Sequence, residues 1–495
     1  MCPPLDMGER EIDAFAALNP YDANKTEEDA ISKMIPHVSI RFSYQRWLAS
    51  NHYGRWLIVV AGVLINLALG VRHAWSVFGS PLAAAYKWDS LTVTWPLILS
   101  TIVFAVLMIP AGRWNDRWGP RPVGLVGGVL VSAGFVLSSL APHDPSEAGV
   151  AWVWIMLAYG VLTGVGSGLG YAVPVATALR WFPDQRGLVT GLAVLGFGLS
   201  AALFGPLANT MIMESGVWTT FYQLGIAFLI MIVVGSLLLT NPPVGWHPAG
   251  WKAAADSSTP IHARHHYSPG QLLRMKQTYL LILMYAFSTA AGLMVISFAK
   301  SFLDSFQFDD LAAVQGLNWL NALPIIGFNL FTGKPAELSA VLVGWLAVWN
   351  ALGRMIIGWL SDAIGRHKTM ALNFVLTAMS VSLMPLFAAS AWLTLLLYLL
   401  IGVTFGGTLT LFPATNADWF GTTHVGVNYG IIFLGWGVGG VIGPLVGNFG
   451  VGMLGGYQAG FIFAAILGLM ATLMARAIQA PAAHLQVQPE PVPDD

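Results

Sequence analysis

The sequence predicts an all-α membrane protein whose twelve transmembrane helices form two pseudo-symmetric six-helix bundles. The first observation is composition: of the 495 residues, 56% are hydrophobic and 9% are charged, whereas a soluble domain has about 25% charged residues. The second is a series of twelve long apolar stretches, which at about 22 residues each occupy a little over half of the chain. The third is a set of motifs that recurs in both halves. The single cysteine, Cys2, excludes an intrachain disulfide and any cysteine-based metal site.

The N-terminal half begins with a hydrophilic segment, residues 1–54, which we expect to be cytoplasmic. This segment is rich in acidic residues and lacks a long apolar run, so it is not a signal peptide. An N-terminal six-helix bundle is expected over residues 55–240. Its apolar stretches lie at 56–80, 91–111, 122–141, 150–176, 187–211 and 217–240.

The C-terminal half follows a hydrophilic, proline-containing segment, residues 241–277, which we expect to be a central cytoplasmic loop. A C-terminal six-helix bundle is expected over residues 278–479, and the proline-rich, acidic tail at 480–495 is expected to be disordered. An outer insertion at 305–337 has a short apolar part broken by polar residues and proline, so we expect an interfacial helix there, without an assigned function. The apolar stretches of this half lie at 278–303, 338–360, 369–388, 391–413, 426–449 and 456–478.

The positions of lysine and arginine predict the orientation. Most of the 23 Lys and Arg residues fall in the termini, the central loop and the loops on that same side of the membrane. Because cytoplasmic segments are enriched in these residues, we expect both termini to be cytoplasmic and the chain to lie in the inner (plasma) membrane of a bacterium. The formal net charge of −1 gives no sign of a nucleic-acid partner.

The two halves share motifs in register, which indicates an internal duplication. Asp116 and its flanking glycines recur 246 positions later around Asp362. The fourth and tenth spans agree at an offset of 238, and the fifth and eleventh spans agree at an offset of 239, through glycine, threonine and aromatic positions. Two similar halves around a central cavity are typical of a carrier that alternates access by rocking.

The loops after the second and eighth spans predict a gate. They read GRWNDRWGPRPV and GWLSDAIGRHKT, and each places an aspartate beside glycine and a basic residue at a cytoplasmic helix end. We predict that Asp116, Arg117, Asp362 and Arg366 belong to a gate that joins the halves. The alternative is ordinary positive-inside charge with a turn glycine, which does not explain the same aspartate spacing twice. The G-x-x-x-D-x-x-G pattern resembles the major facilitator superfamily.

Four further motifs resemble the oxalate/formate antiporter family of that superfamily. They are RWFPDQRG (180–187), LFPATNADWFG (411–421), NYG (428–430) and GRHKTM (365–370), and they occur in the right order. The likeness covers about residues 55–478. It implies twelve helices, a central site, and transport of small carboxylates such as oxalate, formate, pyruvate or lactate.

Arg354 is the principal candidate for binding substrate. It lies eight residues before Asp362, and therefore about 12 Å into the span, close to the mid-depth of the hydrocarbon at about 15 Å. A lone arginine there costs at least about 2.5–3.5 kcal/mol, so we expect it to have a function. Its planar fork matches a carboxylate. The alternative is a structural arginine that binds backbone carbonyls. The family resemblance implies that Arg354 binds the substrate carboxylate.

Aromatic residues are the next candidates. In the oxalate carrier of the family the eleventh span has a lysine after the NYG motif, whereas the matching residue here is Trp436. The internal repeat aligns Trp436 with Phe197, and both lie between glycines. We predict that they clamp a small organic anion, which favours a monocarboxylate; the alternative is that Trp436 only packs. Tyr171, Phe405 and Phe433 match aromatic cavity positions of the family, and they either line the site or pack.

A second intramembrane arginine, Arg72, leaves the substrate charge open. It is followed by His73 and Trp75 in the outer half of the first span. Arg72 either snorkels to the outer interface or faces the cavity together with Trp75. In the second case the second positive charge has moved from span 11 to span 1, and dicarboxylate binding survives. Because no Asp or Glu lies in mid-span, we expect anion exchange or a proton that travels with the substrate, with His73 as the coupling candidate.

Together these features predict a secondary active transporter of small carboxylate anions, by exchange or linked to protons, and not an enzyme. We expect a monomer in the lipid bilayer, with no cofactor, no metal and no nucleic-acid partner. The alternatives are a carrier of the same superfamily for an unrelated solute, such as a sugar or drug, and a multipass receptor. Embedded carboxylates or many mid-span amides would favour the first alternative, and a soluble sensory domain would favour the second.

Overall fold

The computed structural model describes residues 44–51, 53–243, 245–248, 266–304, 335–387, 390–454 and 458–481. Most of the N-terminal segment, the interfacial helix expected in the outer insertion and the tail lie outside the described residues. The described residues up to Arg55 form a small unit with Pro242–Trp246, in which the Trp246 indole N–H donates to the Ala49 carbonyl at 3.1 Å. Trp56–Asn241 and the residues from His247 onward form the helical unit that carries the candidate site.

The N-terminal half of the helical unit contains six membrane-crossing stretches. Two of its helices are broken locally: the first by a 3₁₀ turn, η1, and the fourth by a π-helical segment, η3. Gly216 adopts φ 83°, a left-handed conformation that separates two helices within α10. The elements are α4 (Trp56–Leu69), η1 (Gly70–Ala74), α5 (Trp75–Tyr86), α6 (Ser90–Trp118), α7 (Pro120–Ser138), η2 (Pro145–Glu147), α8 (Ala148–Ile155), η3 (Met156–Thr163), α9 (Gly164–Trp181) and α10 (Arg186–Leu238).

Among the described residues, the C-terminal half contains six long helices. The repeated glycines that follow Asp116 and Asp362 both turn the chain with positive φ, 82° at Gly119 and 93° at Gly365, so the repeat preserves a backbone requirement. The elements are α11 (Pro269–Leu272), α12 (Lys276–Asp304), α14 (Pro335–Ile364), α15 (Arg366–Phe387), α16 (Ala391–Phe420), α17 (Val425–Leu454) and α18 (Gln458–Ala477).

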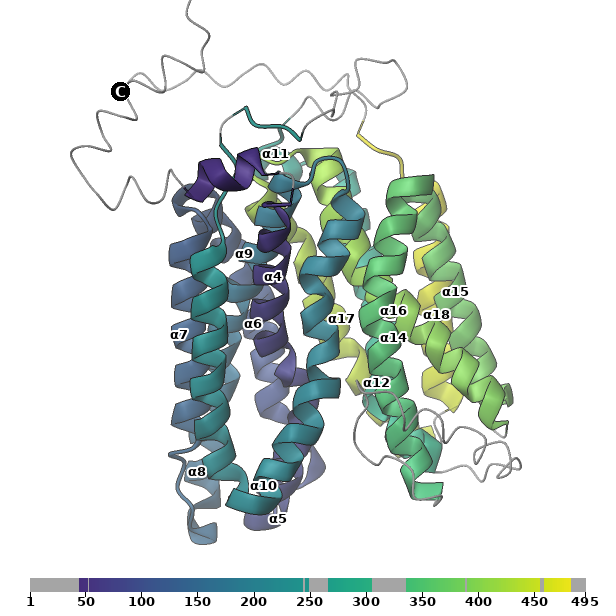
Figure 1. Cartoon of the computed structure of the whole chain (residues 1–495). Coiled ribbons are helices and arrows are strands. Elements are labelled where there is room, and N and C mark those ends of the chain that lie inside the picture. The colour runs from purple at the N-terminus through teal and green to yellow at the C-terminus, as the bar shows by residue number, and fades with distance from the viewer. Residues whose placement is uncertain are drawn as a thin grey trace, which may run out of the picture. The chain divides into compact units, whose positions relative to one another are not determined.

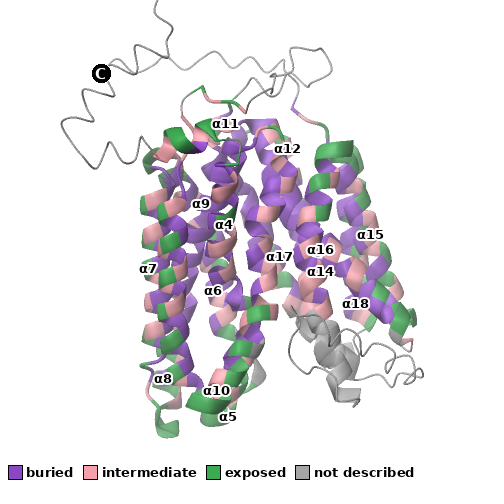
Figure 2. Ribbon diagram, viewed as in Figure 1, coloured by how far each residue is buried: buried purple, intermediate pink, exposed green. Residues whose placement is uncertain are grey.

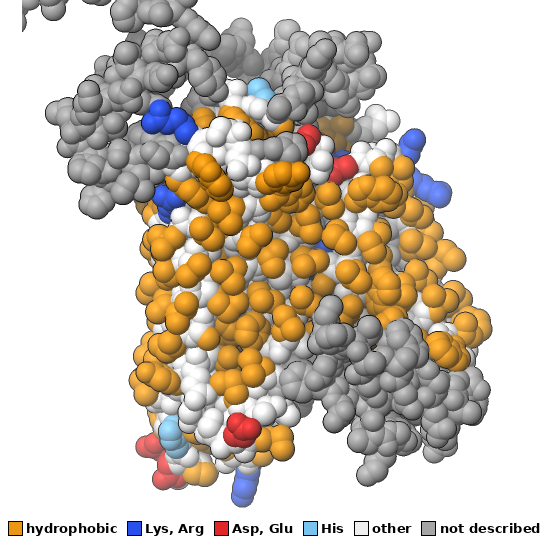
Figure 3. Space-filling view, viewed as in Figure 1, with side chains coloured by type: hydrophobic (Ala, Val, Ile, Leu, Met, Phe, Trp, Pro, Cys, Tyr) orange, Lys and Arg blue, Asp and Glu red, His pale blue; other side chains and the backbone are white. Residues whose placement is uncertain are grey.

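The predicted fold class is confirmed. The described residues contain helices and no strand, and eleven helical stretches are long and apolar enough to cross a membrane; α14 is the helix that covers the remaining predicted stretch, 338–360. The two halves lie beside each other, with the N-terminal helices in purple to teal and the C-terminal helices in green to yellow (Figure 1). Buried residues face the interior of the helical unit (Figure 2). On the face drawn in Figure 3, hydrophobic side chains cover the middle, and the charged side chains lie towards the two ends.

Two helix pairs join the halves and position the site. α6 packs against α17, and α10 packs against α14. The pairs approach closely because glycines lie at the crossings: a Cβ on Gly112 would lie 2.2 Å from the carbonyl oxygen of Gly426, and a Cβ on Gly187 would lie 2.3 Å from the carbonyl oxygen of Gly358. Backbone therefore meets backbone across the boundary between the halves.

Candidate functional site

Arg354 lies inside the helical unit and does not face lipid. Its side chain is 1% exposed. One terminal nitrogen donates to the Val194 carbonyl of α10 at 2.6 Å, and the other donates to Asn350 Oδ1 of its own helix at 3.0 Å. Nε has no hydrogen-bond partner within the described ranges. Arg354 therefore has features of both alternatives. A backbone carbonyl and an amide oxygen orient its guanidinium, as expected for a structural arginine, while Nε stays unpaired, as expected for a residue that binds a substrate.

Arg72 is also buried, which argues against a side chain that snorkels to the outer interface. It is 3% exposed. One terminal nitrogen donates to Thr101 Oγ1 at 2.6 Å, and Thr101 donates in turn to the Leu97 carbonyl at 2.8 Å. The other terminal nitrogen has no hydrogen-bond partner in the part of the chain that the structure describes. The Arg72 guanidinium lies 5.1 Å from the ring centre of Phe104 and 5.8 Å from that of Trp436, within the range of cation–π attraction.

Five buried rings form a contiguous group that touches both arginines, and we call them the aromatic cluster. α6, α9 and α10 supply three of the rings and α17 supplies two, so both halves contribute. Ring centres in contact are 4.9 to 6.2 Å apart, and none of the rings is more than 2% exposed. The members are Phe104, Tyr171, Phe197, Phe433 and Trp436. Phe104, which sequence analysis missed, contacts the other four.

Both arginines contact the aromatic cluster, at different rings. The Arg354 guanidinium lies 5.8 Å from the centre of Phe197, and Arg72 lies against Phe104 and Trp436. His73 places its ring edge-on to Phe197 at 4.8 Å, although the histidine itself is exposed. His73 therefore borders space that a water molecule can enter, beside the aromatic cluster. Its Nδ1 lies 3.1 Å from the Gly70 carbonyl.

Two predicted site residues have other neighbours. The Trp75 indole N–H donates to the Val93 carbonyl at 2.9 Å, and its ring packs on Tyr159 at 4.2 Å. Phe405 packs against Gly292 of α12, where a Cβ would lie 2.3 Å from a Phe405 ring carbon. The structure does not bring either ring into contact with the aromatic cluster.

The two buried cations are not neutralised by any carboxylate that the structure describes. Among the described residues, neither Arg72 nor Arg354 forms an ion pair with an aspartate or glutamate. The described part of the chain also contains no group of three or more His, Cys, Asp or Glu that could hold a metal ion. The interior therefore combines two positive charges with aromatic walls.

The aspartates that form ion pairs lie instead at the end of the helical unit where α10 and α17 begin. Asp116, in α6 of the N-terminal half, accepts the backbone N–H groups of Gly426 at 3.2 Å and Val427 at 3.1 Å. These N–H groups belong to the first turn of α17, which has no helical partners for them and carries a positive partial charge. Asp116 also pairs with Arg180 at 2.5 Å.

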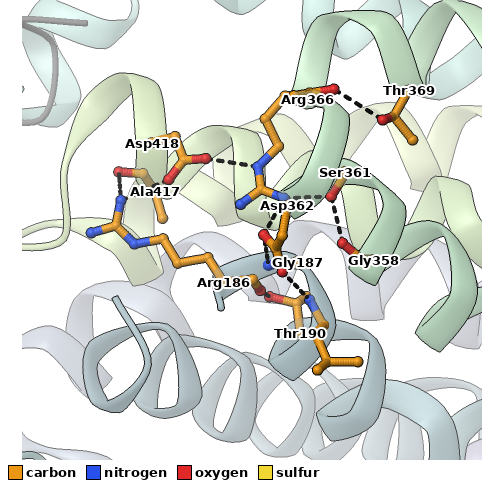
Figure 4. A network of polar contacts seen from close by, with 12 residues as sticks. Arg186, Gly187, Thr190, Gly358, Ser361, Asp362, Arg366, Thr369, Ala417 and Asp418 are labelled. Carbon is orange, nitrogen blue, oxygen red and sulfur yellow. Dashed lines mark hydrogen bonds and ion pairs between the residues drawn. The ribbon is translucent and has the colours of Figure 1, made fainter. Parts of the chain in front are cut away.

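The C-terminal half makes the reciprocal contact. Asp362, in α14, accepts the N–H groups of Gly187 and Leu188 in the first turn of α10, each at 2.8 Å, and pairs with Arg366 at 2.7 Å. Each half thus holds the start of a helix in the other half. The arrangement around Asp362 is drawn in Figure 4.

Asp418 adds a second ionic connection at this end. Its two carboxylate oxygens pair with Arg186 of the N-terminal half at 2.7 Å and with Arg366 of its own half at 2.7 Å (Figure 4). Arg366 also donates to Ser361. We call the set Asp116, Arg180, Arg186, Asp362, Arg366 and Asp418 the latch.

Three of the four predicted gate residues belong to the latch. Arg117 is exposed, and Arg180 pairs with Asp116 in its place. Sequence analysis missed Arg180, Arg186 and Asp418. The repeat carried a signal for two of them, because an offset of 238 places Asp418 at the position of Arg180, with the opposite charge.

The family model described as Major Facilitator Superfamily matches residues 57–349 and 334–494. A solved structure of the proton:xylose symporter XylE is similar in fold, with a TM-score of 0.64 at 14% identity, and the match covers 86% of this chain and 96% of that one.

Three curated relatives are similar over most of their length. The oxalate:formate antiporter of Oxalobacter formigenes is 26% identical over 423 residues, 85% of this chain and 90% of the relative. The uncharacterized transporter YhjX of Escherichia coli is 26% identical over 387 residues, 78% and 86% of the two chains. Monocarboxylate transporter 13 of Rattus norvegicus is 25% identical over 415 residues, 83% and 85% of the two chains.

Proposed function

Because this chain belongs to the Major Facilitator Superfamily of membrane transporters, we propose that it is a secondary carrier of small carboxylate anions. The observation that carries the proposal is Arg354, a buried guanidinium that no acidic side chain neutralises among the described residues. The relatives named as an oxalate:formate antiporter and a monocarboxylate transporter support the same class of solute.

The solute supplies the anion that Arg354 lacks. A charge buried in a dry interior is stable only when it is paired or hydrogen-bonded on all sides. Val194 and Asn350 hold the two terminal nitrogens and fix the plane of the fork, but they are neutral and leave Nε without a partner. A carboxylate, which accepts hydrogen bonds on two oxygens, completes this set and cancels the charge.

The aromatic cluster provides the rest of the binding surface. Its rings exclude water around the solute, which strengthens the pairing with Arg354. Phe197 on α10 and Trp436 on α17 contribute one wall from each half, so that closing the halves around the solute buries it. Trp75 and Phe405 then support the site from outside the cluster.

The latch supports transport by alternating access. It joins the halves at one end, which we propose to be the cytoplasmic end, and we place the opening to the outside at the other end, beside the exposed His73. In this arrangement the site faces the outside of the inner membrane, and opening the latch exposes it to the cytoplasm. Both termini are then cytoplasmic. Coupling occurs by exchange of one anion for another, or by a proton carried with the substrate through His73.

The test is uptake of labelled anions by proteoliposomes that contain the full chain. Formate, pyruvate, lactate and oxalate are supplied outside, with and without an unlabelled anion inside. We expect saturable uptake of at least one of them and loss of that uptake in Arg354→Gln. The latch contacts should stay unchanged in this variant. Arg354→Lys is the matched variant, which keeps the charge but loses the fork, and should retain weak uptake. Full activity of Arg354→Gln would refute the proposal.

Stimulation by internal anion would establish exchange. If internal anion has no effect and an inward proton gradient drives uptake, a proton-linked mechanism applies, and His73→Gln should then abolish the response to the gradient.

A further inference from the structure

The last two turns of α6 have an outer face that the latch does not use. Gly112 and Asp116 point inward, towards the start of α17. Residues four apart on a helix share one face, and on the opposite face four side chains are exposed. They are Arg113, Trp114, Arg117 and Trp118, and we call them the arginine–tryptophan patch. The patch includes Arg117, the predicted gate residue that the latch leaves out.

The two arginines of the patch carry unpaired positive charge. Arg113 and Arg117 lie one turn apart, and among the described residues neither forms a side-chain hydrogen bond or an ion pair. Arg121 differs, because its Nε donates to the Leu239 carbonyl at 2.9 Å. Like charges at this spacing repel each other. Two guanidiniums on one helix face suit an anion with several oxygens, such as a phosphate group.

The two tryptophans place the patch at the level of the lipid headgroups. Trp114 is 38% exposed and Trp118 is 55% exposed, and their rings stack at 5.8 Å. The membrane-crossing stretch Leu91–Trp118 has 28 residues, which makes it about 42 Å long, whereas the hydrocarbon is about 30 Å thick. The last turns therefore extend into the interface, where tryptophan is enriched. A ligand that contacts both kinds of side chain is amphipathic.

The internal repeat shows that neither the helix end nor its aspartate requires the patch. An offset of 246 carries Asp116 onto Asp362 and preserves the glycines on either side. The same offset replaces the two arginines by Trp359 and Ala363, and the two tryptophans by leucine and isoleucine. Asp362 still binds the first turn of α10. The patch is thus a feature of one half alone, added to a structure that forms without it.

We propose that the arginine–tryptophan patch binds an anionic phospholipid. Arg113 and Arg117 hold its phosphate group, and Trp114 and Trp118 lie against its glycerol backbone and the upper part of its acyl chains. A lipid with net negative charge compensates the two guanidiniums, whereas phosphatidylcholine brings a cation of its own. Charge complementarity therefore selects the anionic class. The bound lipid anchors the end of α6 that carries Asp116 at the membrane surface.

Lipid binding to the purified full chain tests the site, measured by native mass spectrometry in detergent. Phosphatidylglycerol and phosphatidylcholine with the same acyl chains are compared. We expect the unmodified chain to bind phosphatidylglycerol more tightly by about tenfold. Arg113→Gln with Arg117→Gln should weaken phosphatidylglycerol about tenfold or more, as expected when two basic residues leave an anionic surface, and should change phosphatidylcholine less than about threefold.

Two further double variants separate charge from general contact. Arg274→Gln with Lys276→Gln is the matched control, because both residues are exposed near the start of α12, a helix without tryptophan. This pair removes the same charge and should leave the lipid preference unchanged. Trp114→Leu with Trp118→Leu keeps both arginines and should weaken the two lipids alike, with the preference retained.

A soluble phosphate distinguishes a lipid from a free anion. Glycerol 3-phosphate at the concentration of the lipid should not displace phosphatidylglycerol, because it lacks the acyl chains that the tryptophans contact. The proposal is overturned if the unmodified chain shows no preference for phosphatidylglycerol, if the arginine variant keeps that preference, if the control pair abolishes it equally, or if glycerol 3-phosphate displaces the lipid. None of these outcomes bears on the transported solute, which the Arg354 variants test.

Discussion

Asp362→Asn is expected to open the latch. The Asp362 carboxylate accepts the N–H groups of Gly187 and Leu188 at 2.8 Å each and pairs with Arg366 at 2.7 Å. Asparagine keeps one acceptor oxygen and loses the other, together with the negative charge. A hydrogen bond to a charged group contributes about 1.5–3 kcal/mol, and a charge at a helix N-terminus contributes about 0.3–1 kcal/mol.

A loss of about 2 kcal/mol multiplies the ratio of open to closed latch by about 30, because about 1.4 kcal/mol corresponds to a factor of ten. The assay uses Thr190→Cys, a fully buried position one turn along α10 from the latch, in a Cys2→Ser background. A membrane-impermeant maleimide applied from the latch side labels this cysteine only when the latch opens, so the labelling rate follows the open population.

We expect the labelling rate to rise about 10- to 100-fold in Asp362→Asn. Asp144→Asn is the matched control, because Asp144 also accepts a backbone N–H, from Ser146 at 2.8 Å, but it caps the short helix η2 outside the latch. A change of less than threefold in Asp362→Asn would refute the assignment of the latch.

Three further variants test other contacts. Gly112→Ala should hold the latch open and abolish transport, because the new Cβ would lie 2.2 Å from the Gly426 carbonyl oxygen; maleimide labelling that stays slow would contradict this. Asp418→Asn should remove one of the two carboxylates that pair with Arg366, at a cost of about 1–3 kcal/mol to the closed latch. The purified chain should then unfold at a lower temperature and the maleimide should label faster; an unchanged melting curve would count against it. The Thr92 hydrogen bonds lower the pKa of Asp89, the N-cap of α6, so its contribution to stability is present above pH about 4 and falls as the pH drops through the folded-state pKa. Asp89→Asn keeps the cap and should reduce the acid sensitivity of the melting temperature, and an identical pH profile would rule out this contribution.

The fold could be predicted from the sequence because a chain that crosses a bilayer can adopt few structures. Long apolar stretches must be helical, and the repeated Asp116 and Asp362 motifs align the two halves. The local interruptions of the helices were harder to predict from the sequence. The π-helical segment at Met156–Thr163 has no proline or charge that separates it from the surrounding helix, and the Arg72 and His73 side chains within the 3₁₀ turn at Gly70–Ala74 indicate a functional position and not a break in the helix.

The site was harder to predict because a side chain's direction depends on helix packing. Arg117 was predicted for the gate since it follows Asp116, but neighbours in a helix point about 100° apart, and Arg180 from α9 reaches the carboxylate. Phe104 was missed because one phenylalanine in an apolar helix carries no signal. Arg354 was identified because a charged residue in the middle of a membrane span has few roles other than a functional one.

The contacts at the latch also determine how transport should respond to temperature. At this end carboxylates accept backbone N–H groups and glycine packs against glycine. Opening of the latch therefore exposes polar groups to water and little apolar surface. Heat capacity changes mainly with newly hydrated apolar area. The enthalpy of opening should therefore stay nearly constant between cold and warm membranes, and a turnover limited by this step should give a straight Arrhenius plot.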